Sequence, residues 1–262
     1  MYWKTKLNNP PLILLLLVLT LLTGSCAPKL FHHIARQEQI TIDSTSSIDS
    51  SIYKTIIPFR DSLNKIMDQP IGNSSHVLSC YKPESPLSNF VADLVLEAGI
   101  NFIKTHGEQQ LPSVAVVNTK GLRAPLPQGT VTVGNIYEIM PFENSMVAVQ
   151  LTGLQMQKLF DHMVSEGGDG LAGASFTMSP SQANEVLVNN KKLNDQNLYW
   201  VFTSDYIADG GDHYTILKES SNIIFSPFTI RNLIMKKVKE LQKNNLQVEP
   251  SKIIRIRKDH PN

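Results

Sequence analysis

The chain has 262 residues, enough for one large domain or two small ones with a real hydrophobic core. Hydrophobic residues make up 42% and charged residues 18%, which is ordinary for a globular protein. The formal net charge of +1 gives no electrostatic argument for a nucleic-acid partner, and we expect none.

The N-terminus carries a targeting pattern. Lys4 and Lys6 precede an aliphatic run, Leu12 to Leu22, that is too short for a comfortable membrane span. The run closes with Leu-Thr-Gly-Ser and then Cys26. Small residues before a cysteine resemble the lipobox of bacterial lipoproteins, which implies that Cys26 becomes the lipidated N-terminus. The alternative is an ordinary signal peptide with a chance cysteine.

These patterns predict three segments: a lipoprotein signal peptide at 1–25, a flexible serine-rich tether at 26–50 and a folded domain at 51–258. Ala27, rather than aspartate, follows Cys26, which by the usual sorting pattern indicates a periplasmic, outer-membrane lipoprotein. Cys80 would then stand alone in an oxidising compartment, and we expect a buried, inert thiol there.

Helical hydrophobic spacing predicts four main helices, and capping residues set their ends. They cover 52–67 with a kink or restart at Pro58, 86–106 ending at Gly107, 153–165 capped by Thr152, and 228–242 started by Pro227. Asn135 is predicted to cap a short helical turn at 136–140.

Short apolar runs predict the strands, and the glycines between 167 and 173 predict a flexible loop. The predicted strands are 76–80, 114–117, 130–133, 146–151, 174–178, 185–188, 198–204 and 253–256, with a hairpin turn at Asn189-Asn190. Helices and strands mix without strict alternation, so we expect an α+β fold with mixed sheets flanked by helices.

The sequence lacks the spacings of common catalytic sites. It has no H-x-x-H or H-E-x-x-H pattern, no nucleophile elbow, no P-loop and no Gly-x-Gly-x-x-Gly. We therefore expect no catalytic residue, metal site or cofactor in this chain.

Polar and aromatic residues in loops after predicted strands suggest a ligand pocket instead. Asn118 can donate and accept at a base edge, and Arg123 offers a planar fork for phosphate or carboxylate. Phe142 and Tyr206 can present flat faces to a planar ligand, and Asp212 can accept from two hydroxyls. From spacing alone, Phe142 could equally be a core residue, Arg123 a surface ion pair and Asp212 a turn residue.

Five motifs occur in the order found in the C-terminal domain of 5′-nucleotidases, and the match covers about 51–257. They are Glu84-Ser-Pro-Leu-Ser-Asn-Phe-Val-Ala-Asp93, Val117-Asn-Thr-Lys-Gly-Leu-Arg123, Met140-Pro-Phe-Glu-Asn144, Leu151-Thr-Gly153, and Thr203-Ser-Asp-Tyr206 through Gly210-Gly-Asp212. The chain resembles this family, which implies a layered α/β/β/α domain that binds the nucleoside.

The resemblance implies a role for each candidate residue. Phe142 and Tyr206 would stack on the two faces of the base, with Asn118 near its edge. Arg123 would point towards ribose or phosphate, and Asp212 would accept from the ribose hydroxyls with Asn144 in support. In the family, a separate N-terminal domain holds two divalent metals and hydrolyses the phosphate ester.

Some positions depart from the family pattern. Lys120 replaces a small residue beside the pocket, Tyr206 stands where phenylalanine is common, and His213 stands where glycine is common. No metallophosphatase motif precedes the predicted domain in this sequence.

Our leading hypothesis is therefore the substrate-binding half of a split 5′-nucleotidase, with both metals supplied by a separately encoded metallophosphatase partner. The alternatives are a non-enzymatic lipoprotein that captures nucleosides or docks a partner, a degenerate structural remnant, and autonomous hydrolysis.

Overall fold

The computed structural model describes Pro11 and residues 46–259, and residues from Ser50 onwards form one compact unit. The predicted signal peptide, Cys26 and most of the predicted tether lie outside the described residues. Within the part of the chain that is described, no helix has the length and apolar character needed to cross a membrane.

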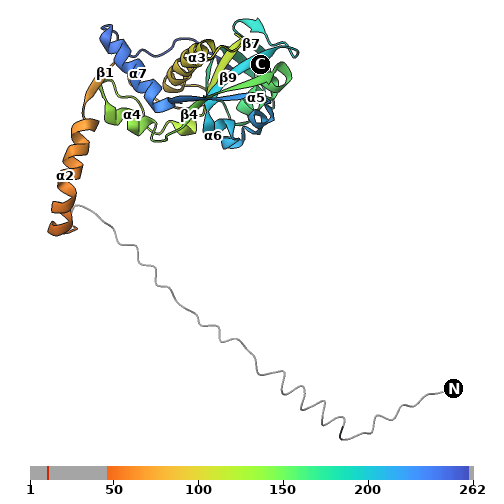
Figure 1. Cartoon of the computed structure of the whole chain (residues 1–262). Helices are drawn as coiled ribbons and strands as arrows, with labels where there is room; N and C mark the ends of the chain where they lie inside the picture. The colour runs from red at the N-terminus through yellow and green to blue at the C-terminus, as the bar shows by residue number, and fades with distance from the viewer. Residues whose placement is uncertain (1–10, 12–45, 260–262) are drawn as a thin grey trace. The chain divides into compact units, whose positions relative to one another are not determined.

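A five-stranded mixed sheet, to which the strands labelled β4 and β9 in Figure 1 belong, forms the centre of this unit. Its strand order is β10-β4-β9-β2-β5. Its strands are β2 (Ser113–Val117), β4 (Ser145–Thr152), β5 (Gly170–Ala172), β9 (Leu198–Ser204) and β10 (Ile223–Thr229). The central strand β9 runs parallel to β2 and antiparallel to β4. Every residue of β2 is buried, as expected for a strand covered on both faces.

Two hydrophobic cores lie on the two faces of the sheet. Successive strand residues point to opposite faces, so Ala115 and Val117 enter one core and Val114 and Val116 the other. The first core is covered by α3 (Pro86–His106) and α7 (Ile230–Lys243), and the second by α5 (Gly153–Ser165) and a second sheet.

The second sheet has the strand order β11-β6-β7-β8. It comprises β6 (Ala174–Met178), β7 (Ala183–Val188), β8 (Lys191–Lys192) and β11 (Ile256–Lys258). The mixed sheets with helices on their outer sides confirm the predicted α+β fold.

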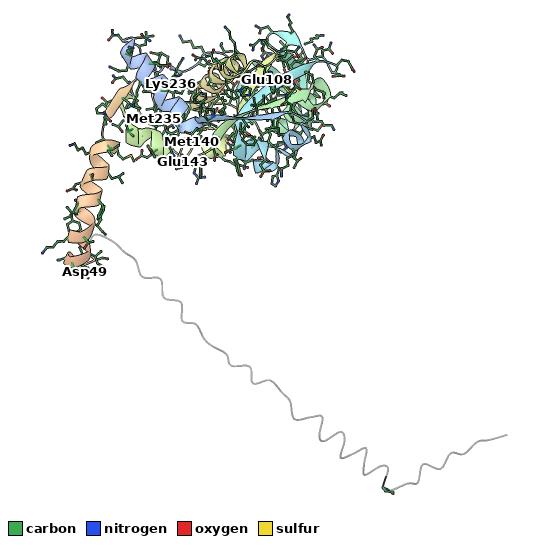
Figure 2. The ribbon with its side chains drawn as sticks, in the orientation of Figure 1. Asp49, Glu108, Met140, Glu143, Met235 and Lys236 are labelled. Carbon is green, nitrogen blue, oxygen red and sulfur yellow. The ribbon has the colours of Figure 1, made fainter. Side chains whose placement is uncertain are left out.

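A smaller substructure lies beside the first core. β1 (Pro70–Ser74) pairs with β3 (Gly129–Thr132), and α4 (Val133–Ile139) follows directly. The preceding helix, α2 (Ser50–Met67), buries none of its residues, and its side chains project into solvent from Asp49 onwards (Figure 2). It continues through Pro58, so the helix does not restart there.

Capping residues explain where the packed helices begin. Ser85 and Thr152 each form a reciprocal capping box at the start of α3 and α5, which confirms the predicted Thr152 cap. The predicted cap of α4 was wrong: Thr132 is the cap, and Asn135 is its partner three residues later.

Several predicted elements need correction. The predicted strand at 76–80 is a single bridge between Leu78 and Leu126, because only Leu78 pairs in a strand-like way. The glycine-rich loop contains the buried strand β5, which pairs with β2. The last helix begins at Ile230 with Thr229 as its cap, because Pro227 belongs to β10. The closing strand is 256–258 rather than 253–256.

The predicted hairpin at Asn189-Asn190 is confirmed between β7 and β8. The φ angles of Asn189 and Asn190 are 49° and 62°, in the left-handed region that a two-residue hairpin turn requires. Asparagine adopts this region more readily than most residues, so the two adjacent asparagines were enough to predict the turn.

Candidate functional site

Three loops meet at one edge of the central sheet, the edge at which β2 and β9 end and β4 begins. The segments that follow β2 and β9 leave at the same edge, because these strands are parallel. β4 is antiparallel to β9, with Met146 opposite Ser204, so the segment before β4 reaches that edge too. The topology therefore gathers Asn118, Tyr206 and the corner at 141–144, although they are far apart in sequence.

Asn118, Tyr206 and Asp212 form a polar cluster at this edge. The side-chain amide of Asn118 donates to Asp212 Oδ2 at 2.7 Å, and the Tyr206 hydroxyl donates to Asp212 Oδ1 at 3.4 Å. Asn118 is only 7% exposed. A Cβ at Gly121 would lie 2.9 Å from Asn118 Oδ1, so glycine there leaves room for the amide. The structure thus brings three of the six candidate residues into direct contact.

Two side chains behind this cluster, the half-buried His162 and the buried Tyr214, help to hold Asp212 in place. Asp212 lies in the 3-10 turn η2 (Gly211–His213) with φ 49°, a strained conformation for a residue with a side chain. Its carbonyl oxygen is 2.9 Å from His162 Nε2 on α5. The His162 ring meets the Tyr214 ring edge-on, with 4.4 Å between centroids. These contacts hold the left-handed turn at Asp212 in place.

Asp169 connects this support to the Asn118 loop. Its carboxylate accepts from the Tyr214 hydroxyl at 2.6 Å and from the backbone amide and hydroxyl of Thr119 at 2.8 and 2.9 Å. Asp169 is 2% exposed. Because Thr119 follows Asn118 directly, Asp169 ties the loop after β2 to the loop after β9.

The Tyr214 phenol remains a donor over a wide pH range. Burial raises its pKa well above the ordinary value, and the negative charge of Asp169 raises it further. Sequence reasoning missed Asp169, Tyr214 and the use of His162, because their contacts depend on tertiary structure. The position of Asp169 between glycines at 168 and 170 was the one available signal.

Charged side chains surround the outer rim of the cluster. Lys120, in the turn η1 (Thr119–Gly121), lies 3.0 Å from Glu166 Oε2 and 3.9 Å from Asp212 Oδ1. Lys82 lies 3.7 Å from the same Glu166 oxygen. The bond from Lys120 is the main cause of the lowered pKa of Glu166 and of the raised pKa of Lys120.

Arg123 is exposed beside this rim. Its Nη1 lies 3.5 Å from the Lys120 carbonyl oxygen, and its backbone amide donates to the Ile139 carbonyl at 2.8 Å. It forms no ion pair with any residue that the structure describes. The guanidinium is therefore available to an anionic ligand, and the expectation of a surface ion pair is not met within the described residues.

The segment Pro141–Asn144, the aromatic corner, carries Phe142 with 43% of its surface exposed. The corner is held by Arg231 of α7, which is 3% exposed. Arg231 Nη1 donates to the carbonyls of Met140, Pro141 and Phe142 at 3.2–3.3 Å. Sequence analysis missed this arginine, because nothing in the pattern of α7 shows that it points inward.

Arg231 has further partners around the corner. Its guanidinium lies 4.3 Å from the centre of the Tyr137 ring and pairs with Glu143, which lies near Met140 beside α4 (Figure 2). Phe142 is thus an exposed side chain on a fixed backbone, rather than the core residue of the alternative interpretation.

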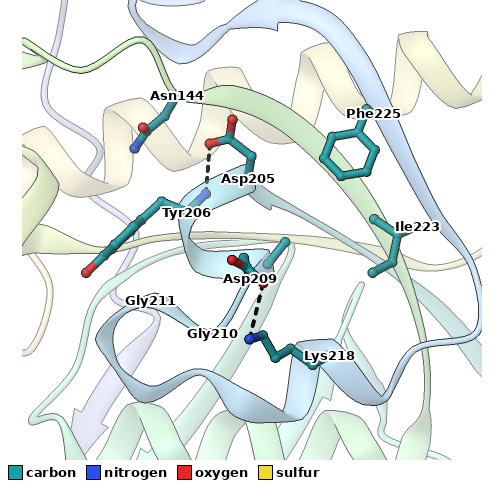
Figure 3. Close-up of a pocket in the computed structure, with 10 residues that line it drawn as sticks. Asn144, Asp205, Tyr206, Asp209, Gly210, Gly211, Lys218, Ile223 and Phe225 are labelled. Carbon is teal, nitrogen blue, oxygen red and sulfur yellow. Dashed lines mark hydrogen bonds and ion pairs between the residues drawn. The ribbon is translucent and has the colours of Figure 1, made fainter.

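An open pocket of about 920 Å³ lies next to the polar cluster. Asn144 and Tyr206 line one side of it, and Ile223 and Phe225 of β10 line the other (Figure 3). Tyr206 belongs to α6 (Asp205–Ala208), and its ring lies over Gly211, where a Cβ would come within 2.5 Å of the ring.

Asp205 ties Asn144 and Tyr206 to the same framework. Its Oδ1 accepts from the Tyr206 amide at 2.8 Å, and its Oδ2 accepts from the Ser145 amide at 3.1 Å, next to Asn144. The other four candidate residues, Asn118, Arg123, Phe142 and Asp212, do not line this pocket. The sandwich between Phe142 and Tyr206 therefore stays a prediction, while Asn144 and Tyr206 share one pocket wall.

Within residues 46–259, no three His, Cys, Asp or Glu side chains gather in a way that would hold a metal ion. Cys80 is partly buried, donates to the Thr119 carbonyl at 3.6 Å, and has a pKa raised by burial, so its thiol stays protonated. We assign no metal-dependent step to these residues.

The fold and this edge together define a ligand-binding α+β domain, and comparison with known proteins identifies its family. The sequence profile described as "5′-nucleotidase, C-terminal domain" matches residues 65–219, more than half of the chain. The chain belongs to this family, as the motifs predicted.

The relatives are longer proteins. The trifunctional nucleotide phosphoesterase protein YfkN of Bacillus subtilis is 26% identical over 204 residues, which cover 70% of this chain and 14% of that protein. The 5′-nucleotidase of Homo sapiens is 23% identical over 210 residues, which cover 69% and 36%. The solved 5′-nucleotidase precursor of Thermus thermophilus aligns with a TM-score of 0.67 and 26% identity, over 80% of this chain and 43% of its own. The chain spans less than half the length of these relatives.

Proposed function

We propose that this chain is the nucleoside- or nucleotide-recognising half of a split 5′-nucleotidase. A separately encoded metallophosphatase chain would supply two divalent metals and hydrolyse the phosphate ester. The observation that carries the proposal is the polar cluster of Asn118, Tyr206 and Asp212, held ready at one sheet edge beside an open pocket. Membership in a nucleotidase family favours a nucleotide-related ligand.

Each candidate residue has a place in this proposal. Asp212 and Asn118 would bind the ribose and the adjacent base edge, since a carboxylate and an amide together accept from and donate to such groups. Phe142 and Tyr206 would stack on the base, Asn144 would support it, and the unpaired Arg123 would meet ribose or phosphate. In nucleic-acid binding proteins, stacking contributes roughly 1–3 kcal/mol per base.

The proposal includes attachment to the periplasmic face of the outer membrane through a lipid on Cys26. The lipobox-like sequence before Cys26 supports it. Cys26→Ser should then release the chain from the membrane fraction into the soluble periplasm. Unchanged fractionation of this variant would count against the anchor.

Calorimetry with the purified chain tests recognition. We expect adenosine and AMP to bind, and Phe142→Ala and Tyr206→Ala each to weaken binding by about 10- to 100-fold, the equivalent of about 1–3 kcal/mol of stacking. Both side chains are 43–48% exposed, so the variants should fold normally, which circular dichroism would check. Leu154→Ala, at an exposed apolar side chain on α5, is the control.

Kinetics with a metallophosphatase tests the split enzyme. A metallophosphatase encoded next to this chain, mixed with it and a divalent metal, should release phosphate from nucleotides, and the two aromatic variants should raise KM. If the chain binds nucleosides but adds nothing to hydrolysis, it is a binding lipoprotein rather than an enzyme component. If it binds neither adenosine nor AMP, the proposal fails altogether.

A further inference from the structure

Lys120 places a cation at the mouth of the polar cluster. Its Nζ lies 3.9 Å from Asp212 Oδ1, and its side chain is 56% exposed, whereas that of Asp212 is 15% exposed. The Lys120 ammonium thus lies on the solvent side of a carboxylate that the protein has largely buried. A ligand that binds to Asp212 would therefore lie close to Lys120.

Lys120 and Arg123 are the two cations that the loop after β2 places at this rim. Of the carboxylates close by, Asp169 is occupied by Thr119 and Tyr214, and Glu166 is shared between Lys82 and Lys120. Arg123 has no carboxylate partner among the described residues, and its Nη1 reaches the Lys120 carbonyl. Two cations of one loop can therefore turn towards an anionic ligand.

We propose that Lys120 is a specificity-determining residue that selects ligands with a phosphate monoester on the ribose edge held by Asp212, over unphosphorylated nucleosides. The proposal rests on the proposed function, which places the ribose hydroxyls at Asp212. A phosphate on the 2′ or 3′ oxygen would meet the Asp212 carboxylate, and repulsion would exclude it from a site without a compensating cation.

The geometry of Lys120 suits this task. A lysine ammonium is a compact charge on a flexible stem, so it can leave Glu166 and follow a phosphate without a fixed bidentate geometry. Its partial exposure leaves it free to move, while Lys82 remains beside Glu166 when Lys120 turns away. Glu166 is therefore paired with a lysine whether Lys120 stays beside it or turns towards the ligand.

A purely structural role for Lys120 makes a different prediction. If the Lys120–Glu166 pair only fastens η1, removing it would weaken all ligands alike through a looser Asn118. Selection for a charged ribose edge would instead change the ratio between ligands. The ratio is therefore the quantity to measure.

The test is calorimetry on the purified chain with adenosine, 5′-AMP and 3′-AMP, for the wild type, Lys120→Met and Lys237→Met. Lys237 is the matched control, because it forms a lysine–carboxylate pair with Glu97 between α7 and α3, outside this edge. We expect the wild type to bind 3′-AMP about tenfold or more tighter than adenosine. Lys120→Met should remove most of this preference and leave adenosine binding within about twofold.

The outcomes separate the inference from the proposed function. An equal loss for all three ligands would overturn selection in favour of a fastening role. A loss confined to 5′-AMP would overturn the placement at the ribose edge. In both cases adenosine still binds the wild type and the proposed function stands. If the wild type binds none of the three, the proposed function and the inference fall together.

Discussion

The polar cluster and the aromatic corner lie at the same sheet edge, but different kinds of contact hold them. Behind Asp212, the support runs from the half-buried His162 through the buried Tyr214 to the buried Asp169. At Phe142, the support is one buried guanidinium that binds successive backbone carbonyls, while the ring itself stays exposed.

This difference shows how the protein can position side chains for a ligand before the ligand arrives. In the polar cluster, the recognising groups already contact one another, so little ordering remains to be done on binding. In the aromatic corner, only the backbone is fixed, and the Phe142 side chain can still adjust. The first arrangement favours selectivity, and the second tolerates different planar ligands.

The largest effect is expected from removing Arg231, which supports the corner. Arg231→Met should lower the free energy of unfolding by about 3 kcal/mol, because it leaves the buried Met140 carbonyl and the partly buried Pro141 and Phe142 carbonyls without a donor. It should also weaken base binding by releasing Phe142. Urea denaturation and calorimetry with adenosine measure the two effects.

Arg257→Met is the control for this change, since Arg257 is an exposed arginine on β11. If Arg231→Met unfolds at the wild-type urea concentration, Arg231 does not hold the corner. If it loses stability but keeps full affinity for adenosine, the corner is not part of the binding site.

The sequence predicted the outline of both regions but not their supports. Thr152 and the 3.6-residue apolar spacing predicted α5, because both signals are local. Asn189-Asn190 predicted the hairpin between β7 and β8 for the same reason. The position of Arg231 could not be predicted, since its partners lie about ninety residues away in the chain. The role of Asp169 could not be predicted for the same reason, since its partners Thr119 and Tyr214 are also distant in sequence.

Burial was also beyond the reach of periodicity. α2 and α3 both show amphipathic spacing, yet α3 buries ten residues and α2 buries none. The glycines around β5 indicated a flexible loop, whereas they allow close packing: a Cβ at Gly168 would lie 2.1 Å from the Pro83 carbonyl oxygen. Whether an apolar face of a helix or strand is buried depends on the elements that pack against it, and the sequence pattern does not show these.

A smaller effect is expected from removing one hydrogen bond behind the polar cluster, the bond from Tyr214 to Asp169. Tyr214→Phe removes the donor to Asp169 and should cost about 1–2 kcal/mol of unfolding free energy, the usual penalty for a buried acceptor left without its partner. Asp212 should become less well fixed, so adenosine should bind several-fold more weakly. Tyr81→Phe, at an exposed tyrosine, serves as the control.

Alkaline pH provides a second readout for Tyr214. Its pKa is raised in the folded protein, so its contribution is fully present below the unfolded pKa of about 10 and is lost as the pH rises through the folded value. The stability difference between wild type and Tyr214→Phe should therefore shrink only above about pH 10. A difference that shrinks near neutrality would contradict the buried donor.

The smallest effect is expected at the rim, and it depends on acid. The pKa of Glu166 is lowered in the folded protein, first by the bond from Lys120, so its contribution is present above the unfolded value near 4.5 and is lost as the pH falls through the folded value. Glu166→Gln should therefore reduce stability by less than about 1 kcal/mol at pH 7, as for other partly exposed pairs, and by less still as the pH falls below about 4.5.

Urea denaturation of wild type and Glu166→Gln at pH 7, 5 and 3 measures this dependence. Glu108→Gln, a carboxylate of the loop after α3 with no ion pair among the described residues, is the control. A difference that persists unchanged at pH 3 would mean that Glu166 contributes through packing rather than charge. Lys120 would then be held less firmly at the rim than its distances indicate, and the contrast between a fixed polar cluster and a movable rim would become sharper.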